Sequence, residues 1–224
     1  SPAAPAAAAA VGPPAEEARL ETAKKLWRAG WTSWWIQTVL TVIASITLLF
    51  ARTFAAAAGG STAIQSGGAG GLFLAGLGVS LSALSVFWTW GFTRVARRLR
   101  KGEDLTPRLE ARLIRRALRT GIVLNLVGMF ATLFGAEQIV GTLVAKVLSF
   151  QGVTGPAAGA YVAPTATLQA LDIFIVQANT NTLLSHLCSL TITLWLSWAT
   201  RSAQLPYLGA PSAQSSAPAP VASS

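Results

Sequence analysis

Four long apolar runs are the feature that most constrains this chain. They lie at about residues 34–51, 72–92, 122–147 and 171–200. A helix needs about 20 mostly apolar residues to cross the hydrocarbon core of a bilayer. Only 11% of the residues are charged, whereas soluble domains carry about 25%. The sequence therefore predicts an all-α integral membrane protein with four transmembrane helices.

The basic residues predict how these helices are oriented. The chain carries 17 Lys and Arg residues and a net charge of +9. Almost all precede the first run, follow the fourth, or lie between the second and third. By the positive-inside rule, both termini and the central loop lie on the stromal or cytosolic side. The basic residues of the central loop are Arg94, Arg97, Arg98, Arg100, Lys101, Arg108, Arg112, Arg115, Arg116 and Arg119.

Tryptophan gives a second indication of the same topology. All eight Trp residues fall at the run ends that this topology assigns to the inner interface: Trp27, Trp31, Trp34, Trp35, Trp88, Trp90, Trp195 and Trp198. Indole rings prefer the headgroup level, because the ring is apolar and its N–H is polar.

Composition divides the rest of the chain. Residues 1–15 form an Ala/Pro-rich lead that we expect to be flexible, and residues 204–224 form a similar tail that we expect to be disordered. Residues 16–30 predict an amphipathic helix in the inner interface, before the chain turns into the first span. Residues 31–203 then form the four-helix transmembrane domain.

The basic central loop has three interpretations. Its charges can orient the protein and contact lipid headgroups, or they can dock an acidic partner or a transit segment. Nucleic acid is not an expected partner, because no aromatic residues alternate with the basic ones here.

Polar residues inside the third and fourth runs predict how these helices pack. Gly121, Gly128 and Gly135 recur every seven residues on the third run. Asp172, Asn179, His186 and Thr193 recur at the same interval on the fourth. Because seven residues are close to two helical turns, each set forms a stripe. Small residues let helices approach closely, so we expect the glycine stripe to face a polar side of the fourth helix.

Further polar residues accompany these stripes. Asn125 and Lys146 fall near the glycine stripe, whereas Gln177 and Asn181 lie on another face of the fourth run. Amide side chains at such positions can form hydrogen bonds across a helix interface.

The charged and soft donors inside the runs are the weak candidates for a metal site: Glu137, Asp172 and His186. Counting along the helices places Glu137 and His186 at a similar depth, and Lys146 and Asp172 near the outer interface. Such pairs can be neutralised packing contacts, or they can line a path for an ion or a proton. His186 could also ligate a tetrapyrrole. We find no nucleophile–base pair and no nucleotide motif, so we expect neither an enzyme nor a resident cofactor.

Three segments resemble a known family: residues 86–100, 119–149 and 168–190. Each is similar to the plastid inner-envelope family called Tic twenty-one, or permease in chloroplasts, and to its cyanobacterial relatives. With the first run in the expected place, the resemblance covers most of residues 26–201. The Ala/Pro-rich ends do not share it.

The resemblance implies a multi-pass protein of the chloroplast inner envelope rather than the thylakoid. It implies two competing roles, namely a component of the protein-import translocon or a permease for iron. A third possibility is a scaffold or assembly subunit of a larger membrane complex. Four spans cannot enclose a pore for a polypeptide, so an import role requires an oligomer, other translocon subunits or preproteins as partners. For iron transport, the metal would be cargo.

Overall fold

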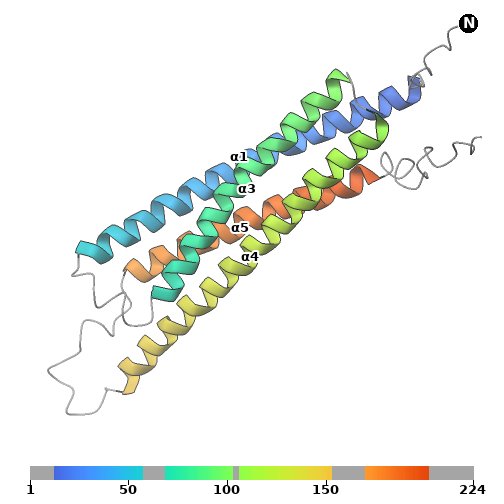
Figure 1. Cartoon of the computed structure of the whole chain (residues 1–224). Helices are drawn as coiled ribbons and strands as arrows, with labels where there is room; N and C mark the ends of the chain where they lie inside the picture. Colours follow the sequence, from blue (N-terminus) through green and yellow to red (C-terminus); the bar gives the residue numbers. More distant parts are fainter. Residues whose placement is uncertain (1–12, 58–68, 103–105, 153–169, 202–224) are drawn as a thin grey trace, which may run out of the picture.

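A computed structural model describes residues 13–57, 69–102, 106–152 and 170–201 of the chain. Every regular element within these residues is an α-helix: α1 (Pro13–Ala57), α3 (Ala69–Lys101), α4 (Pro107–Gly152) and α5 (Ala170–Ala199) (Figure 1). Four helices are long and apolar enough to cross a membrane. The predicted all-α fold with four candidate spans is confirmed.

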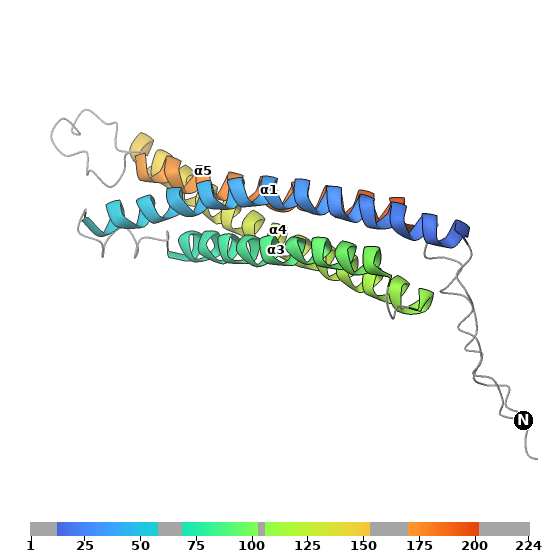
Figure 2. The ribbon, with the colours of Figure 1, turned by 90° about the horizontal axis from the view of Figure 1, so that it is seen from above.

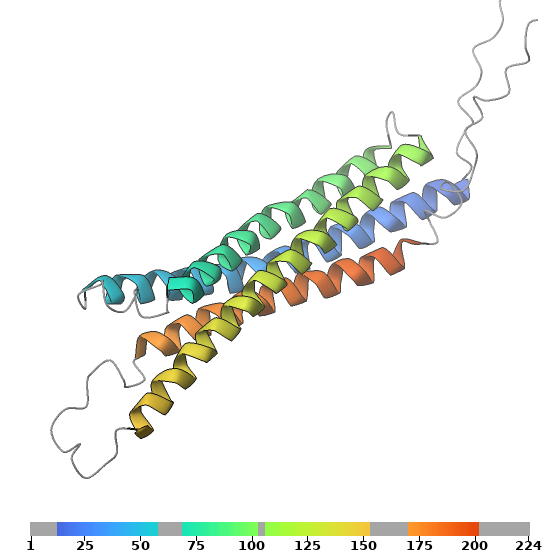
Figure 3. The same cartoon turned by 60° about the horizontal axis from the view of Figure 1, so that its bottom comes forward.

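The helices run up and down along one bundle axis. The start of α1, the α3–α4 connection and the end of α5 lie at the same end, which we call the basic end (Figure 1). Both α1 and α4 pack against α3 and α5, so α1 and α4 occupy opposite corners (Figure 2). α4 crosses the bundle obliquely, from beside α3 at the basic end to beside α5 at the other end (Figure 3).

The structure corrects the expected start of the first span. α1 is one continuous helix of 45 residues, so the turn predicted between residues 16–30 and the span is absent. The expected break lay at Gly30, which instead brings α3 close. A Cβ built on Gly30 would lie 3.2 Å from the Cβ of Phe92. At 1.5 Å per residue, α1 is about 67 Å long and extends beyond a hydrocarbon core of about 30 Å.

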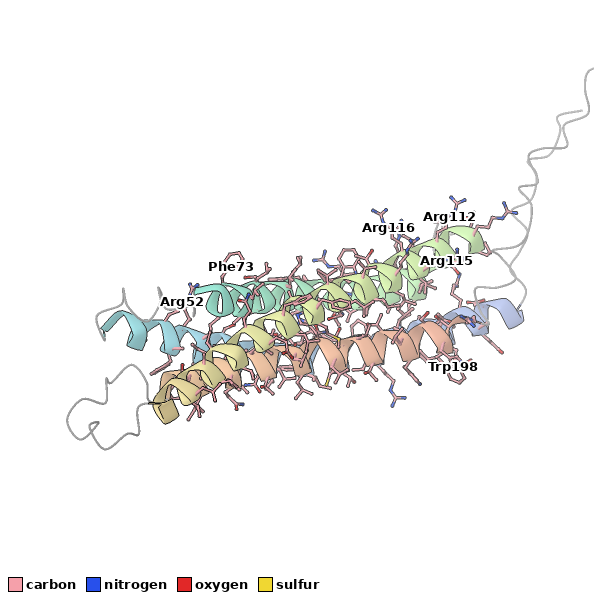
Figure 4. All side chains as sticks on the ribbon, turned by 90° about the horizontal axis from the view of Figure 1, so that it is seen from below. Arg52, Phe73, Arg112, Arg115, Arg116 and Trp198 are labelled. Carbon is pink, nitrogen blue, oxygen red and sulfur yellow. The ribbon has the colours of Figure 1, made fainter. Side chains whose placement is uncertain are left out.

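The basic end has an apolar core. Leu26 of α1, Phe92 and Leu99 of α3, Leu118 of α4 and Leu196 of α5 pack together there, each at most 3% exposed. Charged residues cover the outside, and Figure 4 shows Arg112, Arg115 and Arg116 at this end of α4. This part of the bundle therefore follows the pattern of a soluble protein.

The pattern inverts along the rest of the bundle. There the outside carries large apolar side chains, such as Leu49, Phe73, Phe87, Phe134 and Ile173, each more than 60% exposed. The inside carries mainly hydroxyl, amide and imidazole groups, beside a small apolar cluster of Leu48, Ala75 and Ala178. Lipid solvates apolar side chains as well as another helix would, so membrane bundles associate through close packing and polar contacts. The inversion is what a bilayer-embedded segment requires.

Some predictions fall outside the described residues. They are the lead before Pro13, the tail from residue 204 onward, and any contact of the Lys146 side chain. Residues 13–15, which we had assigned to the lead, form the first turn of α1. Pro13 suits that position, because a proline in the first helical turn gives up no internal hydrogen bond.

Candidate functional site

A column of buried polar side chains runs along the axis of the membrane-embedded part. Its members are at most 7% exposed: Ser33, Gln37, Thr41, Ser82, Ser85, Thr89, Asn125, Thr132, Asn179, Thr182, Ser185, His186, Ser189 and Thr193. Burying such groups away from water costs free energy unless they find hydrogen-bond partners. We call this set of residues the polar column. The hydrogen bonds between its side chains form three layers.

Gln37 organises the layer nearest the basic end. Its Nε2 donates to Ser33 Oγ one helical turn earlier, at 2.9 Å, and to Thr89 Oγ1 of α3, at 2.8 Å. The amide thereby ties α1 to α3. Its Oε1 is buried without a hydrogen-bond partner among the described residues.

Three hydroxyl groups form the layer farthest from the basic end. Thr41 of α1 lies 2.7 Å from Ser82 of α3 and 3.3 Å from Ser185 of α5, measured between hydroxyl oxygens. Ser82 and Ser185 are 2.9 Å apart. Because a hydroxyl can donate one hydrogen bond and accept another, the three can close a ring in which each does both. This ring joins three helices at one level.

Asn125 of α4 is the centre of the layer between these two. Its Nδ2 donates to the carbonyl of Gly121 at 2.8 Å and to Ser189 Oγ of α5 at 2.9 Å. Its Oδ1 accepts from Ser85 Oγ of α3 at 2.9 Å and lies 3.1 Å from His186 Nδ1. A carbonyl only accepts, so the contact with Gly121 fixes which side-chain atom is the amide nitrogen. Asn125 therefore connects α3, α4 and α5.

His186 is fully buried beside this amide. Its Nδ1 faces Asn125 Oδ1, and its Nε2 lies 3.4 Å from the carbonyl of Gly78 on α3. On the α4 side, the ring lies directly against Gly128, where an added Cβ would overlap it. Gly78 is close-packed as well, because its Cβ would lie 2.7 Å from Thr132 Oγ1. Gly128 thus creates the space for the imidazole, and Gly78 lets α3 approach Thr132 of α4.

The two seven-residue stripes meet in register. Cβ atoms built on Gly121 and Gly135 would lie 3.5 Å from Thr193 Cγ2 and 3.5 Å from Asn179 Oδ1 respectively, and Gly128 packs on His186. Each seven-residue step along α4 matches a seven-residue step back along α5. The structure thus brings together the glycine stripe and the polar stripe that the sequence indicated.

The other amides have smaller roles. Asn179 Nδ2 donates to the carbonyl of Thr132 at 3.0 Å, and so ties α5 to α4. Gln177 is exposed, and its amide lies 3.4 Å from the buried Asn181 on the same helix. Asp172 is buried near the start of α5.

The metal candidates do not converge. Glu137 is exposed on α4, and α4 places Gly128, nine positions earlier, opposite His186. Nine residues correspond to about 13 Å along a helix, so the equal depth expected for Glu137 and His186 is wrong. Among the described residues, no three His, Cys, Asp or Glu side chains come together as a metal site would require.

The basic end joins α1 to α4. Arg19 lies 3.7 Å from Glu110, and burial raises the pKa of the Glu110 carboxyl while the Arg19 charge partly offsets this. Gly102 ends α3 with φ of +66°, and its missing side chain leaves room for the Arg19 guanidinium. On α3, the Arg94 guanidinium lies 4.2 Å from the centre of the Trp90 ring, a cation–π contact.

The sequence reasoning missed Gln37 and most of the hydroxyl groups, although it identified Thr193. A signal was present, because Ser82, Ser85 and Thr89 are spaced for one face of α3, as are Gln37 and Thr41 for one face of α1. However, Ser and Thr in helices often bond to their own backbone, as Thr47 and Thr191 do here. Spacing alone does not separate the two cases.

Comparison with known proteins identifies a relative of this chain and the family to which it belongs. It is 33% identical over 189 residues to Protein TIC 21, chloroplastic, of Arabidopsis thaliana. The alignment covers 80% of this chain and 57% of that relative, so the chain spans little more than half of the relative's length. No solved structure matches the chain. The family described as "protein of unknown function (DUF3611)" matches residues 16–200, and the chain belongs to this family.

Proposed function

We propose that this chain is a multi-pass protein of the chloroplast inner envelope and a non-enzymatic membrane subunit of its protein-import apparatus. The likeness to Protein TIC 21, chloroplastic, supports the location and the role. The observation that carries the proposal is the closed polar column. Asn125 bonds to Ser85 and contacts His186, and the three-hydroxyl ring closes on itself across the bundle axis, so a single chain offers surfaces for assembly rather than a passage.

Two surfaces suit assembly. The apolar outside of the spans can pack against other membrane subunits, and the basic end, which we place in the stroma, can contact soluble or peripheral ones. Transit segments are rich in Arg and poor in acidic residues, so the basic end should repel them. We infer that it docks acidic patches of partner subunits, and that preproteins contact the assembly elsewhere.

Site-specific photocrosslinking in intact chloroplasts tests this role. A photoreactive residue replaces Arg97 or Arg115 at the basic end, and Thr53, exposed at the other end of α1, serves as a control. We expect adducts with inner-envelope import subunits from the basic-end positions while a preprotein is arrested in import. If arrested import yields no adduct at either basic-end position, the import role is contradicted. Adducts that do not depend on import would indicate a scaffold subunit.

Iron permeation is the second candidate, and one observation favours it. His186 and Asn125 form a buried polar cluster in the middle of the spans, where transported ions are usually handled. Within the described part of the chain, the hydrogen-bond partners of this cluster include one imidazole and no carboxylate, which is a poor set for iron. Ferrous influx into liposomes that contain the purified chain distinguishes the roles, with His186→Ala and Glu137→Gln beside the wild type. An import subunit gives no flux above empty liposomes, whereas a permease gives saturable flux that His186→Ala lowers.

A further inference from the structure

A groove between α1 and α5 opens at the basic end. It has a volume of about 570 Å³. Lys24, Lys25 and Arg28 of α1 line its outer part together with one carboxylate, that of Glu21. Its inner part is lined by Thr32 of α1 and by Trp195 of α5. The groove therefore changes along its length from cationic to apolar.

The cationic part keeps a net positive charge. Lys25 forms an ion pair with Glu21 one turn earlier, at 3.0 Å. Lys24 and Arg28 are exposed and lie four positions apart, so they stand on the same side of α1. Two flexible cations one helical turn apart suit a single phosphate group, whose oxygens accept charge-assisted hydrogen bonds.

The depth of the groove matches the membrane interface. Trp195 is 50% exposed, and Trp35, just beyond Thr32 on α1, is 58% exposed, as expected for rings at the headgroup level. Arg28 lies about 6 Å and Lys24 about 12 Å from Thr32 along α1. The polar layer on each side of a bilayer is about 5–8 Å thick. Arg28 thus stands at the depth of lipid phosphates, Lys24 stands one helical turn farther out, and Trp195 stands where acyl chains begin.

A second groove at the other end of the bundle provides a contrast. It lies between α1 and α3, and Arg52 is the single charged residue in its lining, which includes Leu48, Phe73 and Leu77. Figure 4 shows Arg52 and Phe73 at this end, far from the arginines of the basic end. Both grooves face lipid, but the α1–α5 groove combines an excess of cations with an apolar continuation.

We propose that the α1–α5 groove is a binding site for one anionic phospholipid. Lys24 and Arg28 hold the headgroup phosphate, and the first part of an acyl chain lies along Thr32 and Trp195. A protein partner fits less well, because the groove continues into the lipid-facing surface of the bundle. The proposal does not depend on the import role.

Native mass spectrometry of the purified full chain tests the site. The protein is taken from nanodiscs of equal parts phosphatidylglycerol and phosphatidylcholine, and the lipid retained per chain is counted. We expect one retained phosphatidylglycerol, preferred about tenfold. The double variant Lys24→Gln/Arg28→Gln should lose this preference. Arg112→Gln/Arg116→Gln removes two exposed charges at the same spacing on α4 and should keep it.

A groove-filling variant and a competition experiment test the site further. Thr32→Trp fills the groove and leaves every cation in place, so it should also lose the retained lipid. Retention by Thr32→Trp as in the wild type would overturn the site, as would equal loss in the two double variants. Competition by inorganic phosphate at millimolar concentration would identify a site for free phosphate and would overturn the lipid assignment.

Discussion

At the scale of single residues, Gly128 is the position where packing leaves the least room. A methyl group there would overlap the His186 ring, so Gly128→Ala must separate α4 from α5 or displace the imidazole. We expect a loss of about 1–3 kcal/mol in the free energy of unfolding, which is typical of overpacked cores. Unfolding of the purified protein in mixed detergent micelles measures it.

Gly141→Ala is the matched control on the same helix. A Cβ at Gly141 would meet nothing within 4 Å, so this variant should lose no stability and can gain up to about 1 kcal/mol from the helix preference of Ala over Gly. Equal losses in the two variants would show that glycine flexibility, rather than the space for His186, matters at these positions.

Asn125 is the other residue on which the polar column depends. Asn125→Leu keeps a similar size but leaves Ser85, Ser189 and His186 with one partner fewer. Hydrogen bonds between membrane helices contribute about 0.6 kcal/mol on average and up to about 1.7 kcal/mol. We therefore expect a loss of about 2 kcal/mol in the same unfolding measurement. Gln177→Leu removes an exposed amide with one long contact and should change the free energy of unfolding by less than about 0.5 kcal/mol. An equal loss in the two variants would contradict the central role of Asn125.

Residue spacing predicted part of this site and missed the rest for a physical reason. The stripes of Gly128 and His186 were readable, because a seven-residue interval keeps side chains on one helix face. The depth of Glu137 could not be predicted in the same way. Counting from the ends of the runs assumes that both helices enter the bilayer at equal heights. Here Gly121 lies opposite Thr193, so the start of the third run and the end of the fourth lie at different heights.

At the scale of elements, the burial of the Glu110 carboxyl makes the junction of α1 and α4 sensitive to pH. Burial raises the pKa of Glu110 above its ordinary value of about 4.3. As pH rises from about 4 through the interval up to the raised pKa, the unfolded chain releases this proton first, so the free energy of unfolding falls. The stability of the wild type relative to Glu110→Gln should therefore be higher at pH 4 than at pH 7.

Unfolding of both proteins across that pH range measures the difference. Arg19→Gln provides a second comparison, because loss of the offsetting positive charge should raise the pKa of Glu110 further and widen the pH interval. Parallel pH profiles for the wild type and Glu110→Gln would contradict this account of the junction.

The sequence reasoning was wrong about the length of α1. A charged stretch followed by Gly30 and an apolar run is typical of an interfacial helix that turns into a span. Here the same glycine allows Phe92 of α3 to approach, and the helix continues. In a sequence, a glycine that allows close helix packing cannot be distinguished from one that permits a turn, because the neighbouring helix is not known.

At the scale of the whole molecule, the bundle has two parts. The basic end has an apolar core and a charged outside, which suits water, and the rest has a polar interior and an apolar outside, which suits lipid. Both termini of the described chain and the α3–α4 connection lie at the end with the apolar core (Figure 1). We propose that this basic end faces the stroma, because translocating its clustered arginines across a membrane would be unfavourable. Impermeant maleimide labelling of intact inner-envelope vesicles tests the orientation.

The labelling uses single cysteines in a Cys188→Ala background, which removes the half-buried native thiol. Lys24→Cys and Arg112→Cys probe the basic end, and Thr53→Cys probes the other end; all three positions are exposed. In right-side-out vesicles, Thr53→Cys should react at once, and the two basic-end cysteines should react only after permeabilisation. The reverse order would invert the proposed orientation. Reaction of Lys24→Cys and Arg112→Cys from opposite sides would contradict the bundle itself, because an odd number of spans would then separate two helix ends that Arg19 and Glu110 bring into contact.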